Sequence, residues 1–223
     1  MSAPREVLIG RNSKVWRAVS ANPRVAARFA WTIGHSDLEG FGFTPTDRVW
    51  VFSYSRIPAE NESLLTRLRE ADVREVVYVS TASAIVTRLT GCYEYPRVKL
   101  AAETAARRLL DARILTLGIV AAAVEELPAG RNAATLHGML EDFMLAPQWP
   151  DEGGTRMNLF ELVDVPFRRG WEAALQRLYD RLQWSVRRWP CILRPFDLVL
   201  RVLGIRWYGY VNLSNRLWTT TTS

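Results

Sequence analysis

The chain has 223 residues, of which 48% are hydrophobic and 23% are charged. This is the composition of a globular protein with one substantial core, and it excludes the disordered, collagen-like and disulfide-scaffold classes. No stretch reaches the roughly 18 to 20 uncharged apolar residues that cross a bilayer, and the first ten residues lack the apolar run of a signal peptide. We therefore expect a cytoplasmic protein in which Cys92 and Cys191 are free thiols.

Positive charge is concentrated in the last quarter of the chain. Residues 166–223 hold ten arginines and three acidic residues, whereas the remainder has 19 basic and 20 acidic residues. Five of the nine tryptophans lie in the same segment. The pI near 9.7 therefore belongs to a basic, aromatic tail and not to the whole surface.

Apolar runs and amphipathic stretches alternate along the first 165 residues. Fully apolar runs predict buried strands, and apolar residues spaced three and four apart predict helices. In chain order they predict a strand at 6–9, a helix from Val15, strands at 28–33 and 48–52, a helix at 58–71, a strand at 76–80, a helix at 95–110, a strand at 113–117, a helix around 133–144 and a strand at 157–163.

This alternation indicates an α/β fold. Buried strands that alternate with amphipathic helices form a parallel sheet covered on both faces, so we predict a doubly wound, mostly parallel Rossmann-like sheet. Only about fourteen residues separate the strand at 28–33 from Arg48, too few for a crossover helix and a further strand. We therefore expect the sheet to be one strand short of a complete dinucleotide-binding fold.

Tyr95 and Lys99 form the sharpest local signal. Four residues are about one helical turn, so the phenol and the ammonium lie on the same face of the predicted helix. A neighbouring cation favours the phenolate and lowers the pKa of a tyrosine from its usual value near 10. The pair therefore predicts an acid/base tyrosine.

Hydroxyl side chains follow the strand at 76–80. Ser80, Thr81 and Ser83 stand at its carboxyl end, which is where ligands bind in open α/β sheets. A hydroxyl in this position can hydrogen-bond a substrate oxygen.

These residues together resemble the short-chain dehydrogenase/reductase superfamily, in particular its extended branch of sugar-nucleotide epimerases and dehydratases. Val77-Tyr-Val-Ser-Thr-Ala-Ser83 is similar to the strand end of the family, and Tyr95-x-x-x-Lys99 with Leu100-Ala-Ala-Glu103 is similar to its catalytic helix. Arg113-Ile-Leu-Thr-Leu-Gly118 is similar to the strand that follows. The resemblance covers residues 5–165 and is specific over 76–118.

The resemblance implies an NAD(P)-binding domain at 1–165 and a Ser/Thr-Tyr-Lys catalytic set. Tyr95 is then the general acid/base, and Lys99 lowers its pKa and holds the nicotinamide ribose. Thr81 or Ser83 orients the reacting oxygen, and Thr81 fits the family pattern better.

The resemblance also places a glycine-rich loop on residues 10–16. Such glycines permit a tight turn, close approach of the pyrophosphate and close helix packing. Gly10 is present, whereas Ser13 and Trp16 stand at the second and third glycine positions, and Trp16 is expected to push the helix off the strand or rotate it. The predicted cofactor-binding residues are Gly10, Arg11, Asn12, Ser13, Lys99 and Gly118.

NAD and NADP both stay open as the cofactor. Arg11 and Lys14 are candidate phosphate ligands and favour a phosphorylated cofactor, whereas Asp37 is equally placed to meet a ribose hydroxyl. No metal site is expected.

The tail at 166–223 is expected to be helical and to pack on the domain or at a membrane or partner surface. Between Cys191 and Trp218, apolar residues alternate with arginines and with Trp207, Tyr208 and Tyr210. Such a segment can lie in a membrane interface at the inner membrane face. The alternatives are that it caps the substrate side of the domain or forms a partner interface, with a homodimer among the options. No nucleic-acid motif accompanies the charge, so no nucleic-acid partner is expected.

The resemblance finally implies an NAD(P)-dependent oxidoreductase or epimerase that acts on a nucleotide- or lipid-linked sugar in surface-polysaccharide synthesis. The alternative is a catalytically weakened Rossmann-like protein that docks to a partner or a membrane through its tail.

Overall fold

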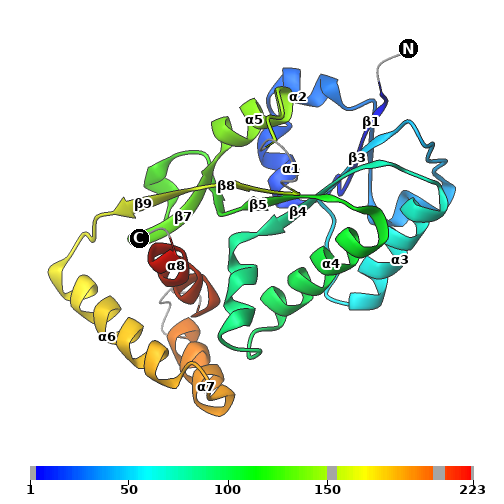
Figure 1. Cartoon of the computed structure of the whole chain (residues 1–223). Coiled ribbons are helices and arrows are strands. Elements are labelled where there is room, and N and C mark those ends of the chain that lie inside the picture. The colour runs from blue at the N-terminus through cyan, green and yellow to red at the C-terminus, as the bar shows by residue number, and fades with distance from the viewer. Residues whose placement is uncertain (1–3, 150–154, 203–208, 222–223) are drawn as a thin grey trace.

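The computed structural model describes residues 4–149, 155–202 and 209–221, and Figure 1 shows its arrangement. Its centre is a parallel sheet with the strand order β2, β1, β3, β4, β5, β8. The strands are β1 Glu6–Ile9, β2 Trp31–Ile33, β3 Arg48–Val51, β4 Glu75–Thr81, β5 Arg113–Leu117 and β8 Arg156–Leu159. The predicted Rossmann-like α/β sheet is confirmed.

The described sheet is also one strand short of a complete dinucleotide-binding sheet, as predicted. After β2 the chain passes through a short 3-10 helix, η1 (His35–Gly40), directly to β3, which pairs with β1 on the side away from β2. A complete dinucleotide-binding sheet carries a further strand beyond β2, and none of the described residues pairs with that edge. The strand order reverses between β1 and β3, which places a ligand crevice at their carboxyl ends.

Helices cover both faces of the sheet (Figure 1). The helices α3 (Pro58–Glu70) and α4 (Glu94–Leu110) lie on one face, and α1 (Lys14–Val19), α2 (Pro23–Arg28) and α5 (His137–Leu145) lie on the other. Because side chains alternate along a strand, Val7 and Ile9 of β1 enter the core under α3 and α4, whereas Leu8 enters the opposite core.

A second, three-stranded sheet adjoins the first. Its central strand, β7 (Gly130–Leu136), pairs parallel with β6 (Ile119–Ala121) and antiparallel with β9 (Glu161–Val165). The Thr135 hydroxyl accepts a hydrogen bond from Gly118 N at 2.9 Å and donates to Leu159 O at 2.5 Å. These two bonds join β7 to the ends of β5 and β8.

Three predicted elements differ in the structure. The segment 28–33 is a strand only over β2, because α2, capped by Asn22, continues to Arg28. The helix predicted around 133–144 begins at His137, because the preceding residues form β7. The strand predicted at 157–163 is two strands, β8 and β9, which belong to different sheets. Short apolar runs do not distinguish strand from helix by periodicity, and here tertiary pairing decides.

The tail is helical, as predicted. It forms α6 (Gly170–Val186), α7 (Pro190–Val202) and α8 (Gly209–Thr221), and the predicted boundary between 165 and 166 falls at the end of β9. Helix α8 packs on β7 and on the 3-10 helix η2 (Ala82–Arg88), which follows β4. Both cysteines are free, and none of the described helices is long and apolar enough to cross a membrane.

Candidate active site

Strand β4 and helix α4 bring the predicted catalytic residues together. Thr81 is the last residue of β4, at the carboxyl edge of the sheet, and its side chain accepts a hydrogen bond from Ser83 N at 3.3 Å to start η2. Tyr95 lies in the first turn of α4, which packs against both β4 and η2. The predicted proximity of a strand-end hydroxyl and the tyrosine is therefore present.

Three hydroxyl groups form a connected set in this place. The Thr81 side chain lies near enough to the Tyr95 phenol to lower its pKa by hydrogen bonding, and Thr81 Oγ1 lies 3.1 Å from Ser83 Oγ. Thr81 is thus the hydroxyl that acts on the pKa of Tyr95, whereas Ser83 bonds to Thr81. Of the two hydroxyls considered from the sequence, the geometry favours Thr81.

Two further tyrosines enclose Tyr95. The Tyr54 ring lies 5.3 Å from the Tyr95 ring, edge-on, and the Tyr210 ring lies 5.5 Å away, tilted by 33°. Burial, followed by the neighbouring Tyr210, raises the pKa of Tyr95 to about 12, although the hydrogen bond with Thr81 acts to lower it. The phenol therefore carries its proton at neutral pH in this structure.

Lys99 is buried beneath an aromatic side chain. Only 7% of the residue is exposed. Its ammonium nitrogen donates to Val79 O at 3.3 Å and lies 4.9 Å from the centre of the Tyr54 ring and 5.5 Å from that of Tyr78. Burial lowers the pKa of Lys99 to about 8. The prediction that Lys99 lowers the pKa of Tyr95 is wrong for this structure, because Tyr54 contacts both side chains and the pKa of Tyr95 is raised.

The turn after β1 fits the first position of a dinucleotide-binding loop. Gly10 has φ of +113°, and a Cβ added there would lie 2.7 Å from Ser53 N. The Gly10 and Arg11 amides both donate to Ile33 O, at 2.8 and 3.1 Å, so the turn is bonded to the end of β2. Only glycine fits this close approach of three strand ends, which is the role of the first glycine in such loops.

Ser13 and Trp16 have separate structural roles in and before α1. Ser13 caps α1 by accepting from Trp16 N at 3.0 Å. The Trp16 ring enters the core, where it meets Phe29 edge-on at 5.2 Å, and only 5% of the residue is exposed. Trp16 therefore packs with Leu8 and Trp50 of the sheet in the core beside the six-residue α1, and the expected displacement or rotation of the helix stays a prediction.

Arg11 and Asp37 form an exposed ion pair at the same edge. Arg11 Nη2 lies 3.0 Å from Asp37 Oδ2, and Asp37 also accepts from Gly34 N at 2.9 Å. A carboxylate in this region suits a ribose hydroxyl, and an arginine suits a ribose phosphate. Asn12 and Lys14 are exposed on the same turn. The turn after β1 therefore fits the phosphate end of a dinucleotide. At Lys99, the residue expected to hold the nicotinamide ribose, the Tyr54 ring covers the ammonium group.

Gly118 lies where the two sheets meet. A Cβ added to Gly118 would lie 2.2 Å from Ala133 O. The glycine therefore permits β7 to approach the end of β5. It also lines a small cavity with Thr81, Ser83 and Tyr95, which places this predicted cofactor-binding residue beside the hydroxyl set.

Helix α8 closes the site from the substrate side. The Ser214 hydroxyl and the Trp218 indole both donate to Ala82 O at 3.0 Å. Asn215 accepts from Ala133 N at 3.0 Å and donates to Arg131 O at 2.7 Å. The part of the tail at 209–218 therefore caps the domain, which was the alternative to a membrane contact, whereas Trp207 and Tyr208 lie outside the described residues.

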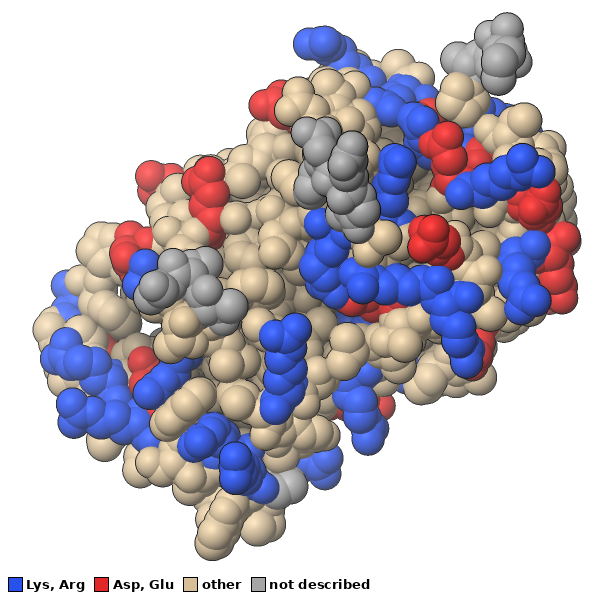
Figure 2. All heavy atoms as spheres, in the orientation of Figure 1, with Lys and Arg blue, Asp and Glu red and all other residues tan. Residues whose placement is uncertain are grey.

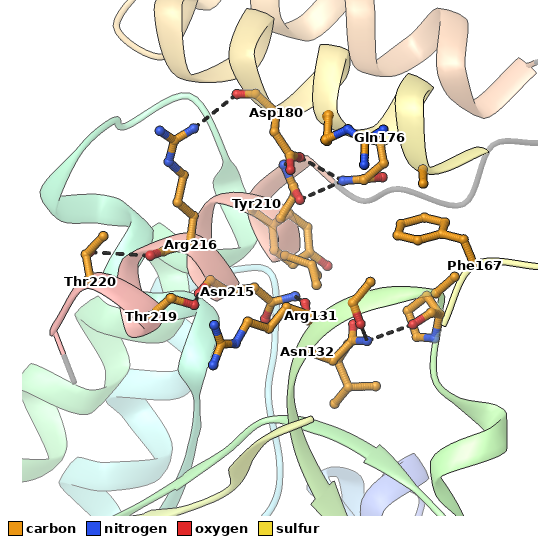
Figure 3. Close-up of a pocket in the computed structure, with 18 residues that line it drawn as sticks. Arg131, Asn132, Phe167, Gln176, Asp180, Tyr210, Asn215, Arg216, Thr219 and Thr220 are labelled. Atoms are coloured by element: carbon orange, nitrogen blue, oxygen red, sulfur yellow. Dashed lines mark hydrogen bonds between the residues drawn. The ribbon is translucent and has the colours of Figure 1, made fainter. Parts of the chain in front are cut away.

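Two cavities meet at Tyr210. The small one, of about 150 Å³, lies between the hydroxyl set and α8, and the large one, of about 740 Å³, lies between α6, α8 and the start of β7 (Figure 3). Tyr210, Val211, Asn215 and Ile119 line both. A ligand that fills the large cavity therefore ends close to Tyr95.

The large cavity combines apolar walls with three arginines and a set of amides. Arg131, Arg177 and Arg216 line it. Asp180 accepts hydrogen bonds from the amides of Gln176 at 2.7 Å and Asn212 at 2.6 Å (Figure 3). Gln176 Oε1 is buried and accepts no hydrogen bond from the described part of the chain. The cavity thus offers cationic groups and a spare acceptor to a polar ligand.

Sequence reasoning missed Tyr54, Tyr210 and Asn215. Tyr54 had a usable signal, since it follows a buried strand at the ligand edge of the sheet. Tyr210 was placed in the tail, which was expected to pack on the domain or at a membrane or partner surface, and was not expected beside Tyr95. Asn215 had no signal, because only the tertiary fold brings α8 to β7.

No protein-family model and no curated protein matches the sequence. Solved structures share the fold. A short-chain dehydrogenase/reductase from Veillonella parvula superposes with a TM-score of 0.52 over 75% of this chain and 100% of its own, at 13% identity. TunA, an NAD-dependent NDP-hexosamine 5,6-dehydratase of tunicamycin biosynthesis, gives 0.52 over 82% of each chain at 14% identity. MoeE5, solved with UDP-glucuronic acid and NAD, gives 0.51 over 77% of this chain and 80% of its own at 14% identity.

These similarities, all at 14% identity or less, concern the fold. They confirm, at the level of the fold, the resemblance found in the sequence. The chain has a Rossmann-type α/β fold, similar to the fold of these short-chain dehydrogenase/reductase and dehydratase structures.

Proposed function

We propose that the chain is an NAD(P)-dependent oxidoreductase of the epimerase or dehydratase type, acting on a nucleotide- or lipid-linked sugar in surface-polysaccharide synthesis. The observation that carries the proposal is the grouping of Tyr95, Thr81 and Ser83 around one small cavity at the carboxyl edge of the sheet. A buried phenol beside strand-end hydroxyls, at the edge where α/β sheets bind ligands, is a proton-transfer device.

The chain's own groups supply the proton chemistry. Because its pKa is raised, Tyr95 is a neutral phenol and donates its proton to a substrate carbonyl oxygen as that oxygen becomes a hydroxyl. In the reverse direction its conjugate base removes a hydroxyl proton. Thr81 stabilises that base, since its hydrogen bond lowers the pKa of Tyr95.

The proposed cofactor site extends from the turn at Gly10 to Lys99. A bound nicotinamide supplies the hydride donor or acceptor. Arg11, Asn12 and Ser13 would hold the phosphate end together with Gly10. The proposal includes both NAD and NADP, because Asp37 suits a ribose hydroxyl and its ion-pair partner Arg11 suits a ribose phosphate. A ribose oxygen reaches Lys99 only when the Tyr54 ring moves away.

The proposed substrate site is the pair of cavities. The small cavity receives the reacting sugar beside Tyr95, and the large cavity receives the carrier. Arginines suit the phosphate groups of such a carrier, and Arg131 of β7 and Arg216 of α8 both line the large cavity (Figure 3). The structural similarity to TunA, an NDP-hexosamine dehydratase, and to MoeE5, solved with UDP-glucuronic acid, supports a sugar nucleotide.

Turnover of a sugar-nucleotide panel tests this function. The protein is incubated with each sugar nucleotide and with NAD⁺ or NADP⁺, and products are separated by chromatography and identified by mass. Tyr95→Phe is expected to lower turnover by about 10² to 10⁴-fold. Tyr93→Phe, two residues away, is the matched control and keeps turnover. Full activity of Tyr95→Phe would contradict the assigned acid/base.

A second candidate is a Rossmann-like protein without catalysis that docks to a partner or a membrane. One observation favours it: Lys99 is covered by Tyr54 and bonded to Val79 O, so the ribose ligand of the proposed enzyme is enclosed. Cofactor binding with no turnover of any sugar would support this candidate.

A further inference from the structure

Helix α7 carries an exposed apolar face. Spacings of three and seven residues place Ile192, Val199 and Val202 in one stripe, with Leu198 beside it. Their exposed fractions are 42%, 54%, 80% and 62%, and Trp189, just before the helix, is 60% exposed. We call these five residues the α7 face.

The opposite side of α7 is anchored to the protein. Leu193 is fully buried. Arg194 donates from Nε and Nη2 to Cys92 O at 3.4 and 3.3 Å, and so joins the helix to the segment before α4. The orientation of the helix is therefore fixed with the α7 face turned outward. An exposed apolar cluster of this kind marks an interaction surface.

Exposed arginines stand on α6, on α7 and in the connection between the two helices. They are Arg181, Arg188 and Arg194, whereas the Asp180 carboxylate is engaged by the amides of Gln176 and Asn212 at the large cavity. Figure 2 shows basic side chains gathered around uncharged ones at the end of the molecule where α6 and α7 lie. The surface around α7 is thus apolar in its middle and positive at its edges.

This pattern matches one class of partner better than the others. In a membrane interface, tryptophan and aliphatic side chains enter the acyl boundary while arginines stay at the headgroups. Anionic headgroups attract those arginines. A second copy of the chain would place like charges opposite each other, and a nucleic acid offers no apolar phase to Leu198 and Val202.

We propose that the chain docks on the surface of an anionic phospholipid membrane through the α7 face. Trp189, Leu198 and Val202 enter the interface, and Arg181 and Arg188 meet the headgroups. This contact does not depend on catalysis.

Vesicle flotation tests the proposal with the full chain. Wild-type protein is mixed with phosphatidylcholine vesicles, with or without phosphatidylglycerol at about 30%, at low and high salt. Binding is expected to be at least about tenfold stronger to the anionic vesicles and to fall with salt. Arg181→Gln with Arg188→Gln is expected to weaken it about fivefold for each arginine.

The α7 face has its own variant and control. Leu198→Ser with Val202→Ser is expected to weaken binding by about tenfold or more. Trp31→Ser is the matched control, because Trp31 is also an exposed apolar residue, 51% accessible, but lies on β2 at the edge of the central sheet. Circular dichroism and thermal unfolding verify that each variant is folded.

Three outcomes would overturn the proposal. One is the absence of flotation with anionic vesicles, and another is equal binding to vesicles that lack phosphatidylglycerol. The third is a dimer, measured by sedimentation without lipid, that the Leu198→Ser and Val202→Ser variant dissociates. That result would make the α7 face a subunit interface.

Discussion

The ammonium nitrogen of Lys99 lies 4.9 Å from the centre of the Tyr54 ring, and the same ring lies 5.3 Å from that of Tyr95. One aromatic side chain therefore separates the two residues whose spacing first indicated a catalytic pair. Contact of Lys99 with a ribose, as proposed, requires Tyr54 to move, and this gives Tyr54 a measurable effect on cofactor affinity.

Tyr54→Ala is expected to bind NAD(P) about threefold or more tightly than the wild type, because affinity is reduced by the fraction of molecules in which the site is covered. Tyr54→Phe keeps the ring and serves as the control, with unchanged affinity. Isothermal titration of both variants measures the difference. Equal affinities for the alanine and phenylalanine variants would show that the ring does not limit access to Lys99.

Thr81 and Ser83 can be separated by their distance from Tyr95. Thr81→Val removes the hydrogen bond that lowers the pKa of Tyr95, so turnover is expected to fall by about tenfold or more and the basic limb of its pH profile to move upward. Ser83→Ala removes a group that contacts only Thr81 and is expected to cost much less. Pre-steady-state rates across pH test this order, and a larger loss in the serine variant would reverse the assignment.

The burial of Lys99 predicts that the stability of the protein depends on pH. Burial lowers its pKa to about 8 in the folded protein, from 10.5. At pH values between about 8 and 10.5, the unfolded chain binds one more proton than the folded protein. The free energy of unfolding therefore rises with pH, by up to about 1.4 kcal/mol per pH unit. The cost of charging the buried lysine is fully present below about pH 8.

Lys99→Met is expected to remove this slope and to be the more stable protein at pH 7. Urea unfolding of both proteins from pH 7 to 9.5 measures the difference, within a range where Tyr95 keeps its proton in the folded and in most of the unfolded chain. Parallel curves for the two proteins would contradict the burial of Lys99 as a charged group.

Asn215 is expected to hold α8 over the site. Asn215→Ala leaves Ala133 N and Arg131 O without their side-chain partner, and should lower the free energy of unfolding by about 1 to 3 kcal/mol. Thr220→Ala, on the exposed end of the same helix, is the control with little effect, since Thr220 bonds only within α8. Chemical unfolding and limited proteolysis at the C-terminus report the two effects.

Local signals predicted the sheet well. Hydrophobic periodicity predicts such elements directly. It predicted the buried strands β3 and β4 and the buried stripe on α3, which consists of Leu64, Leu65 and Leu68. The absence of a further strand beyond β2 among the described residues was predicted from one observation, the short connection between residue 33 and Arg48. The end of β7 from Ala133 was mistaken for the start of a helix because its strand state depends on pairing with β9, whose partner residues lie 27 to 35 positions further along the chain.

The site was predictable only in part. Thr81, Tyr95 and Lys99 are close in sequence, so their joining at one sheet edge follows from the strand and helix that carry them. The aromatic cover of Tyr54 and Tyr210 depends on side-chain packing between distant segments, and it reverses the expected direction of the Tyr95 pKa. The position of the Trp16 ring depends on the space beside Phe29, and only the packed core defines that space.

Calorimetric titration with NAD⁺, NADH, NADP⁺ and NADPH is the most direct test of the central claim. The account predicts saturable binding of at least one of them by the wild type, loss of that binding in Gly10→Ala, whose Cβ would lie 2.7 Å from Ser53 N, and retention in Gly42→Ala, which has open space around it. Failure of the wild type to bind any of the four, or full binding by a folded Gly10→Ala protein, would contradict it.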